Sequence, residues 1–109
     1  MAIQPLTGTP GARLAEARQA LDRGDHDVAL RLLLDLHRRT SHPDVTLNLA
    51  RARMARGDHA AARADFEAVI EAVPQADFPY LMVAECLRNE GRPRDAIEAV
   101  DRLLRLHPA

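Results

Sequence analysis

Apolar residues along the chain recur at the three- and four-residue steps that place side chains on one face of an α-helix. The steps are clearest in three stretches, where the apolar residues share the same offsets: Ala29, Leu33 and Leu36; Ala62, Phe66 and Val69; Ala96, Val100 and Leu103. The prolines that fall near the ends of these stretches, as helix boundaries favour, are Pro43, Pro74 and Pro108. The pattern predicts six helices, near residues 10–22, 26–39, 44–55, 59–72, 77–89 and 93–107.

A tetrapeptide, RGDH, occurs at residues 23–26 and again at 56–59, between predicted helices. Its glycines, Gly24 and Gly57, are 33 residues apart, and Gly91 follows Gly57 after another 34 residues. A chain that reverses between antiparallel helices needs a residue with positive φ, which glycine adopts without strain. The next residue, Asp25 or Asp58, is expected to cap the following helix with its carboxylate. The tetrapeptide therefore indicates a structural unit built more than once, rather than an adhesion loop.

The three units resemble the tetratricopeptide repeat (TPR) family, whose unit is a helix–turn–helix of about 34 residues with small residues at the helix contacts and a terminal proline. The matching small residues are Ala17, Ala50 and Ala84 in the first helices and Ala29, Ala62 and Ala96 in the second helices. The terminal proline is matched by Pro74 and Pro108, whereas the first unit has Ser41 there. The bulky pair of the family's first helix is matched by Tyr80 and Val83, and weakly by Thr46 and Leu49. The first unit departs from the family's pattern, because it has the polar Arg13 and Glu16 there, as fits the end of an array.

This resemblance implies an all-α fold in which three stacked helix pairs form a short right-handed α-solenoid. We expect a flexible N-terminal arm over residues 1–9, followed by one TPR domain over 10–109 with repeats near 10–42, 43–76 and 77–109. The first helix of each pair is expected to line the concave side.

The composition argues against a protein that binds nucleic acid or membranes. The net charge of −1 gives no general attraction to nucleic acid or membranes, and with no Trp, one Tyr and two Phe there are few platforms for stacking bases. All 15 basic residues are arginine, a bias typical of a GC-rich, bacterial genome. The first residues, MAIQPLTGTPGAR, lack the basic and apolar regions of a signal peptide, so a cytoplasmic protein is expected.

No pattern of catalytic or cofactor-binding residues is legible, so we expect neither an enzyme nor a cofactor. His26 and His59 occupy equivalent places about one helix-packing distance apart, roughly 10 Å, too far to share a metal ion. The small cluster of Thr40, Ser41 and neighbouring histidines is typical of a helix end. The single cysteine, Cys86, aligns with an alanine of the second repeat and is expected to be a buried packing residue.

The function that the resemblance implies is a non-enzymatic adaptor that holds a peptide or a partner helix in its concave groove. The residues expected to line this groove are Arg18, Asp22, Leu47, Asn48, Arg51, Phe78, Met82, Glu85 and Asn89. Arg18 and Arg51 are 33 residues apart, so they are expected to form a short ladder suited to carboxylates. Family members that grip a C-terminal carboxylate carry a basic pair where this chain has Phe78 and Met82, which argues against that particular clamp.

Two alternatives stay open: an element whose repeats mainly build a homo-oligomer, and an accessory domain of a larger enzyme. On the last predicted helix, Ile97 and Leu104 are seven residues apart and face where a fourth repeat would pack. Exposed apolar patches usually mark contacts, so we expect this face to self-associate or to dock on another segment.

Overall fold

The computed structural model describes residues 3–108, which form six α-helices and no strand. The helices are α1 (Gly8–Asp22), α2 (His26–Arg39), α3 (Pro43–Ala55), α4 (His59–Ala72), α5 (Asp77–Asn89) and α6 (Pro93–Leu106). All six predicted helices are confirmed, and their ends agree with the prediction to within two residues. None of the helices in the described part of the chain is long and apolar enough to cross a membrane.

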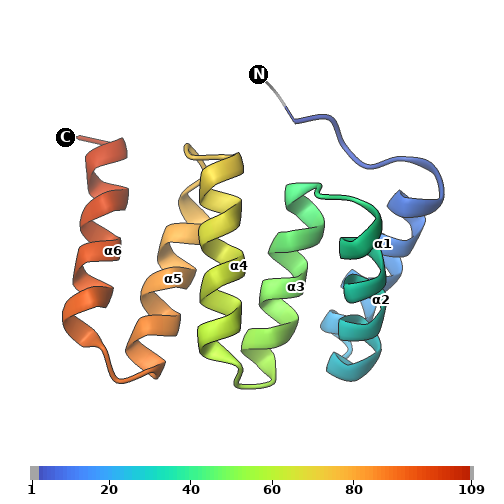
Figure 1. The fold of residues 1–109 in the computed structure, drawn as a ribbon, viewed down its shortest axis with the longest axis horizontal. Coiled ribbons are helices and arrows are strands. Elements are labelled where there is room, and N and C mark those ends of the chain that lie inside the picture. The colour runs from blue at the N-terminus through green and yellow to red at the C-terminus, as the bar shows by residue number, and fades with distance from the viewer. Residues whose placement is uncertain (1–2, 109) are drawn as a thin grey trace.

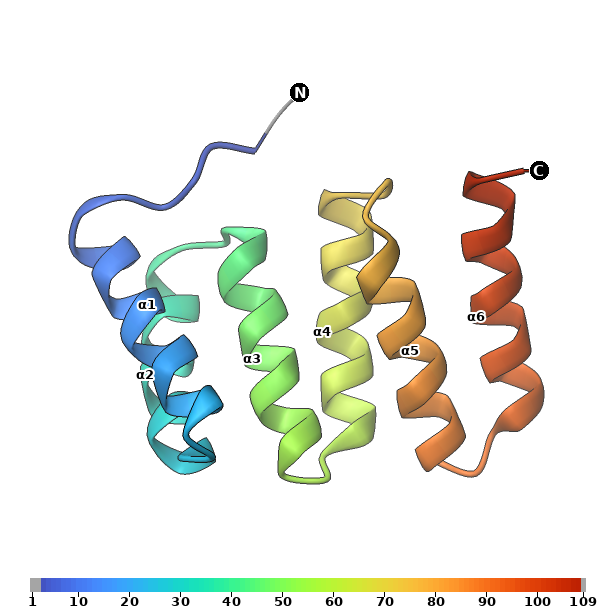
Figure 2. The ribbon, with the colours of Figure 1, turned by 180° about the vertical axis from the view of Figure 1, so that it is seen from behind.

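The helices stack in chain order as three antiparallel pairs, so that the chain is a short α-solenoid. Each helix packs against the next one along the chain, and α1 also contacts α3. Figure 1 looks onto α2 and α4, and Figure 2 looks from behind onto α1 and α5. In Figure 2, α1 stands in front of α2, and α5 stands in front of α4.

The turns inside the three pairs share one backbone arrangement. Gly24, Gly57 and Gly91 have φ of 81°, 86° and 75°, as their place in the sequence predicts. In the middle turn the amide of Gly57 donates to the carbonyl of Met54 at 3.0 Å, and the amide of Asp58 donates to the carbonyl of Arg53 at 2.9 Å. These two bonds satisfy carbonyls that the end of α3 would otherwise leave unpaired, and the same pair of bonds closes the other two turns.

The expectation that Asp25 and Asp58 cap the next helix with their side chains is wrong. Neither carboxylate makes a capping hydrogen bond. Both residues have ψ near 65°, outside the extended region that usually aims a capping side chain at the helix amides. Their backbone amides are instead committed to closing the turn, so the motif is a helix stop whose key residue is the glycine.

The core consists of two clusters that follow the predicted apolar offsets. The first joins α1, α2 and α3 through Leu14, Ala17, Ala20, Ala29, Leu33, Leu36, Val45, Leu49 and Ala52. The second joins α3, α4, α5 and α6 through Ala50, Ala62, Phe66, Ile70, Tyr80, Val83, Cys86, Leu87 and Ala99. Cys86 is fully buried, as predicted, and this burial is the main reason why its thiol has a pKa raised to about 11.

Ion pairs connect neighbouring repeats across the stack. The guanidinium of Arg63 on α4 donates to both carboxylate oxygens of Glu90, just after α5, at 2.7 and 3.0 Å. Arg102 on α6 donates in the same way to Glu67 on α4, and its guanidinium also lies 5.3 Å from the ring centre of Tyr80. These paired geometries fix how one repeat sits on the next.

The N-terminal segment differs from the expected loose arm. Leu6 packs against the first core cluster, and the carbonyl of Gln4 accepts a hydrogen bond from Nε2 of His42 at 2.5 Å. Nδ1 of the same imidazole accepts from the amide of Asp44 at 3.1 Å, which caps α3. Residues 8 and 9, which the sequence predicts to be in the arm, belong to the first turn of α1. Residues 1–2 of the expected arm lie outside the described residues.

Candidate partner-binding surface

The residues that the sequence predicts to bind a partner lie on α1, α3 and α5, the first helices of the three pairs, and we call their set, apart from Leu47, the first-helix face. It is defined by Arg18, Asp22, Asn48, Arg51, Phe78, Met82, Glu85 and Asn89. Equivalent positions in the three repeats are found by counting residues back along the chain from the turn glycines, Gly24, Gly57 and Gly91. Six residues before the glycine stand Arg18, Arg51 and Glu85 in succession.

Two arginines give the first two repeats of this face a cationic character. Arg18 is exposed and makes no hydrogen bond or ion pair with another side chain of residues 3–108. Arg51 is half-buried, and its Nη1 donates to Oδ1 of Asn48 at 2.9 Å. This bond orients the guanidinium of Arg51 and leaves its other nitrogens able to donate to a ligand.

Asn48 does not contact solvent as the sequence prediction required. Its side chain is 2% exposed, and its amide nitrogen donates to the backbone carbonyl of Asp44 at 2.7 Å. With its carbonyl oxygen taken by Arg51, both ends of the amide are occupied inside the protein. Asn48 therefore positions Arg51 and is not itself a ligand contact.

The third repeat contributes an apolar surface and a paired acid. Phe78 is 43% exposed, and its ring meets the buried ring of Phe66 edge-to-face, with centres 6.3 Å apart. That contact holds Phe78 in place and leaves part of its ring open to a partner. Glu85 bonds to Arg88 one turn along α5, and these hydrogen bonds lower the pKa of the Glu85 carboxyl below its ordinary value.

Leu47 contributes to core packing as well as to the surface, and its expected contact with a partner stays a prediction. It is half-buried and packs against the second core cluster, which includes α5. Its counterpart in the first repeat, Leu14, is buried in the same way beneath α3, whereas its counterpart in the third repeat, Leu81, is 45% exposed. Leucine at this position thus packs one repeat against the next, and it is open only where no further repeat follows in the described structure.

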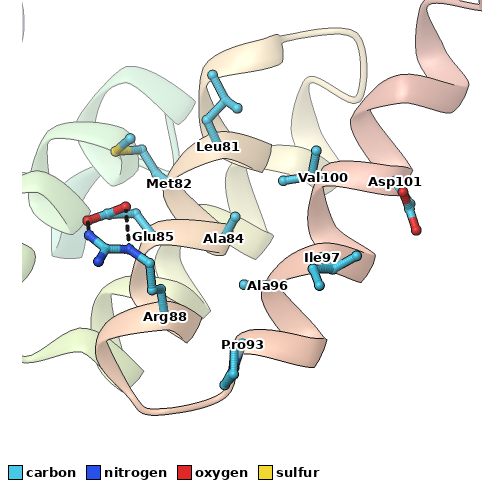
Figure 3. A pocket seen from close by; sticks show the side chains of 10 residues that line it. All are labelled: Leu81, Met82, Ala84, Glu85, Arg88, Pro93, Ala96, Ile97, Val100 and Asp101. Atoms are coloured by element: carbon cyan, nitrogen blue, oxygen red, sulfur yellow. Dashed lines mark hydrogen bonds and ion pairs between the residues drawn. The ribbon is translucent and has the colours of Figure 1, made fainter.

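Beside Leu81 runs an open groove of about 610 Å³ between α5 and α6 (Figure 3). It is lined by Leu81, Met82, Ala84, Glu85, Arg88, Pro93, Ala96, Ile97, Val100 and Asp101. Ile97 and Leu104 are 62% and 60% exposed, which confirms the prediction that they face away from the core. The sequence prediction did not include Leu81, although its alignment with Leu14 and Leu47 could have revealed it.

The helix pairs, turn glycines and shared core offsets agree with what comparison to known families finds. Sequence profiles of the tetratricopeptide repeat match residues 14–77 and 53–109. The chain belongs to the tetratricopeptide repeat family. TPR repeats generally mediate binding between proteins and are typically non-catalytic. No curated protein matches the chain.

Two histidines of this TPR protein occupy equivalent places at the turns of the first and second repeats. The Nδ1 atoms of His26 and His59 are buried without a hydrogen-bond partner, each in the first turn of a second helix. Within residues 3–108, no group of three or more His, Cys, Asp or Glu side chains is arranged to hold a metal ion. The first-helix face and the groove between α5 and α6 are the two candidate surfaces for a partner.

Proposed function

We propose that this TPR protein is a non-enzymatic, cytoplasmic adaptor that binds a segment of a partner protein along its first-helix face. The observation that carries the proposal is the order of chemistry along the face. Two arginines with free donors lie in the first and second repeats, and a fixed, partly exposed Phe78 beside the half-buried Met82 lies in the third. A segment with acidic residues at one end and bulky apolar residues at the other matches this order.

The contribution expected from each arginine is moderate. An arginine–carboxylate contact at a partly desolvated site contributes roughly 1–3 kcal/mol. Reversing Arg51 to glutamate removes that contact and adds repulsion, so it should weaken binding at least about tenfold, since about 1.4 kcal/mol corresponds to one decade. The fold should survive, because Arg51 bonds only to Asn48 among the described residues.

Selection of peptides from a random displayed library on the purified chain tests the proposal without a known partner. The wild type should select sequences that combine Asp or Glu with bulky apolar residues. The double variant Arg18→Glu/Arg51→Glu should select Lys or Arg in place of the acids. Arg31→Glu is a matched control, because Arg31 is exposed on α2 and has no side-chain partner within residues 3–108.

Arg63 is unsuitable as a control, because reversing its charge would set a second carboxylate against Glu90. Circular dichroism should show the same helix content for wild type and variants. Selection of the same peptides by the wild type and by the double variant, or a change in the Arg31→Glu control as large as that in the double variant, would contradict the proposal.

A further inference from the structure

The groove between α5 and α6 has an apolar floor that is covered in the other two repeats. The counterparts of Ala96 are Ala29 and Ala62, and those of Val100 are Leu33 and Phe66; all four are fully buried. Ala96 and Val100 themselves are only half-buried, and Leu81 and Ile97 are exposed. The same positions therefore have the same apolar character in all three repeats but are left open in the third.

A helix covers this floor in each of the preceding repeats. Between α3 and α4 the cover is α5, whose Tyr80, Val83 and Leu87 pack with Ala62 and Phe66. Between α1 and α2 the cover is α3, whose Val45, Leu49 and Ala52 complete the first core cluster. The groove between α5 and α6 thus lies where one more helix would pack in the stack, and Figure 3 shows the side chains that line it.

Charged residues at the turns indicate what the end of such a helix must carry. Where α3 covers the first repeat, Arg56 at its C-terminus pairs with Asp27 of α2. The counterpart of Asp27 in the third repeat is Arg94, an exposed arginine at the start of α6 without an ion pair among residues 3–108. Arg94 is positive where Asp27 is negative, so a helix that ends beside Arg94 should carry an acidic residue at its C-terminus. Glu90, directly after α5, is an acidic residue in the corresponding place.

The same comparison argues against a second copy of this chain stacking head-to-tail through α1. The α1 residues equivalent to Tyr80 and Val83 are Arg13 and Glu16, which would enter an apolar floor without partners. The residue equivalent to Glu90 is Arg23, which would face Arg94 with the same charge. Both features oppose an open chain of stacked copies.

We propose that the groove between α5 and α6 binds an amphipathic α-helix of another protein, which takes the position of a seventh helix in the stack. Its apolar residues, spaced three and four apart, contact Leu81, Ala96 and Val100, and an acidic residue at its C-terminus pairs with Arg94. This site is separate from the arginines of the first-helix face, although Met82 and Glu85 border both.

The structure itself supplies a probe with the required chemistry. A peptide of residues 75–91, acetylated, amidated and carrying Cys86→Ala, reproduces α5, which already covers the equivalent floor and is followed directly by Glu90. We expect fluorescence anisotropy to show binding of the labelled peptide to the full chain. A peptide of residues 8–24, which reproduces the polar α1, is the matched control and should not bind.

Substitutions of Ile97 by a positive or a negative residue test where the peptide binds, because they should change its affinity in opposite directions. Ile97 is the counterpart of Arg63, which pairs with Glu90 in the repeat below. Ile97→Arg should therefore tighten binding of the residue 75–91 peptide at least about threefold, and Ile97→Glu should weaken it by a similar factor. With a Glu90→Arg peptide the order of the two variants should reverse. Ile97 is 62% exposed, so neither change disturbs folding.

Four outcomes decide the proposal. Peptide binding that follows the charge at position 97 and is unchanged by Arg51→Glu supports it, independently of what binds on the first-helix face. Absence of binding overturns it, as does binding that falls equally with Ile97→Arg and Ile97→Glu. Sedimentation that shows a dimer of the chain alone, dissociated by Ile97→Glu and not by Leu34→Glu on the exposed part of α2, also overturns it, because the occupant would then be a second copy.

Discussion

Replacement of Gly57 by residues with a Cβ atom tests the turn on which the repeat architecture depends. Gly57 has φ of 86°, and a Cβ atom added there would meet no atom within 4 Å. A substitution at Gly57 should therefore lower the free energy of unfolding through backbone strain alone, without a contribution from steric clashes. An L-residue in the left-handed region costs roughly 1–2 kcal/mol, and the smaller conformational freedom of the unfolded chain returns about 0.5 kcal/mol.

We expect Gly57→Ala to lower the free energy of unfolding by about 1 kcal/mol. Gly57→Val should cost about 2 kcal/mol, because branching at Cβ crowds the left-handed backbone further. Gly57→Asn should cost least, since asparagine tolerates this region best after glycine. For a chain of 109 residues the unfolding entropy is about 0.23 kcal/mol/K, so the midpoints should fall by about 4 °C for alanine and about 9 °C for valine.

Thermal unfolding followed by circular dichroism at 222 nm measures these shifts. Ala61→Val is the matched control, because Ala61 is exposed on α4 and has a negative φ; there the same side chain should cost only about 0.5 kcal/mol. The assignment of the turn would be refuted by a Gly57→Val protein that melts with the wild type, or by asparagine proving as costly as valine.

Two further predictions concern buried and paired groups. A double-mutant cycle with Arg63→Ala and Glu90→Gln should give a coupling of about 1 kcal/mol at pH 7, and the exposed Arg38–Asp35 pair should give a smaller one. Because hydrogen bonds from Arg63 lower the pKa of Glu90 below 4.5, the coupling should be fully present above pH 4.5 and disappear as the pH falls through the lowered value; a coupling that persists after protonation would contradict it. Cys86, with its pKa raised to about 11, should react with iodoacetamide at pH 8 only as fast as the chain unfolds, and rapid labelling of the folded protein would disprove its burial.

The helices and the core could be predicted because both follow from short-range patterns. A glycine with positive φ ends a helix for reasons contained in four or five residues, and Gly24, Gly57 and Gly91 therefore locate all three turns. The offsets from each glycine then identify residues such as Leu33 and Phe66, which are fully buried. The third repeat shows the limit of this rule, since Val100 has the same offset but is only half-buried.

The details of the first-helix face could not be predicted in the same way, because they depend on neighbours in space. A polar Asn48 at an outer helix position gives no sign that Asp44 and Arg51 will occupy both ends of its amide. The packing of Leu47 depends on where α5 lies, and the contact of Leu6 depends on the path of the chain before α1. The prediction for Arg18 and Arg51 needed only the repeat register; in the structure both lie on first helices, Arg18 exposed and Arg51 half-buried.

Site-specific photo-crosslinking in cells that express the protein tests the adaptor function most directly. A benzoylphenylalanine at Phe78 keeps an aromatic ring on the first-helix face, and the same residue at Leu34 places it on α2, where the native leucine is also exposed. We predict that illumination joins the Phe78 variant to a partner protein, that adding Arg51→Glu suppresses this product, and that the Leu34 variant gives none. Crosslinks that form mainly from position 34, or that form equally with and without Arg51→Glu, would contradict binding at the first-helix face.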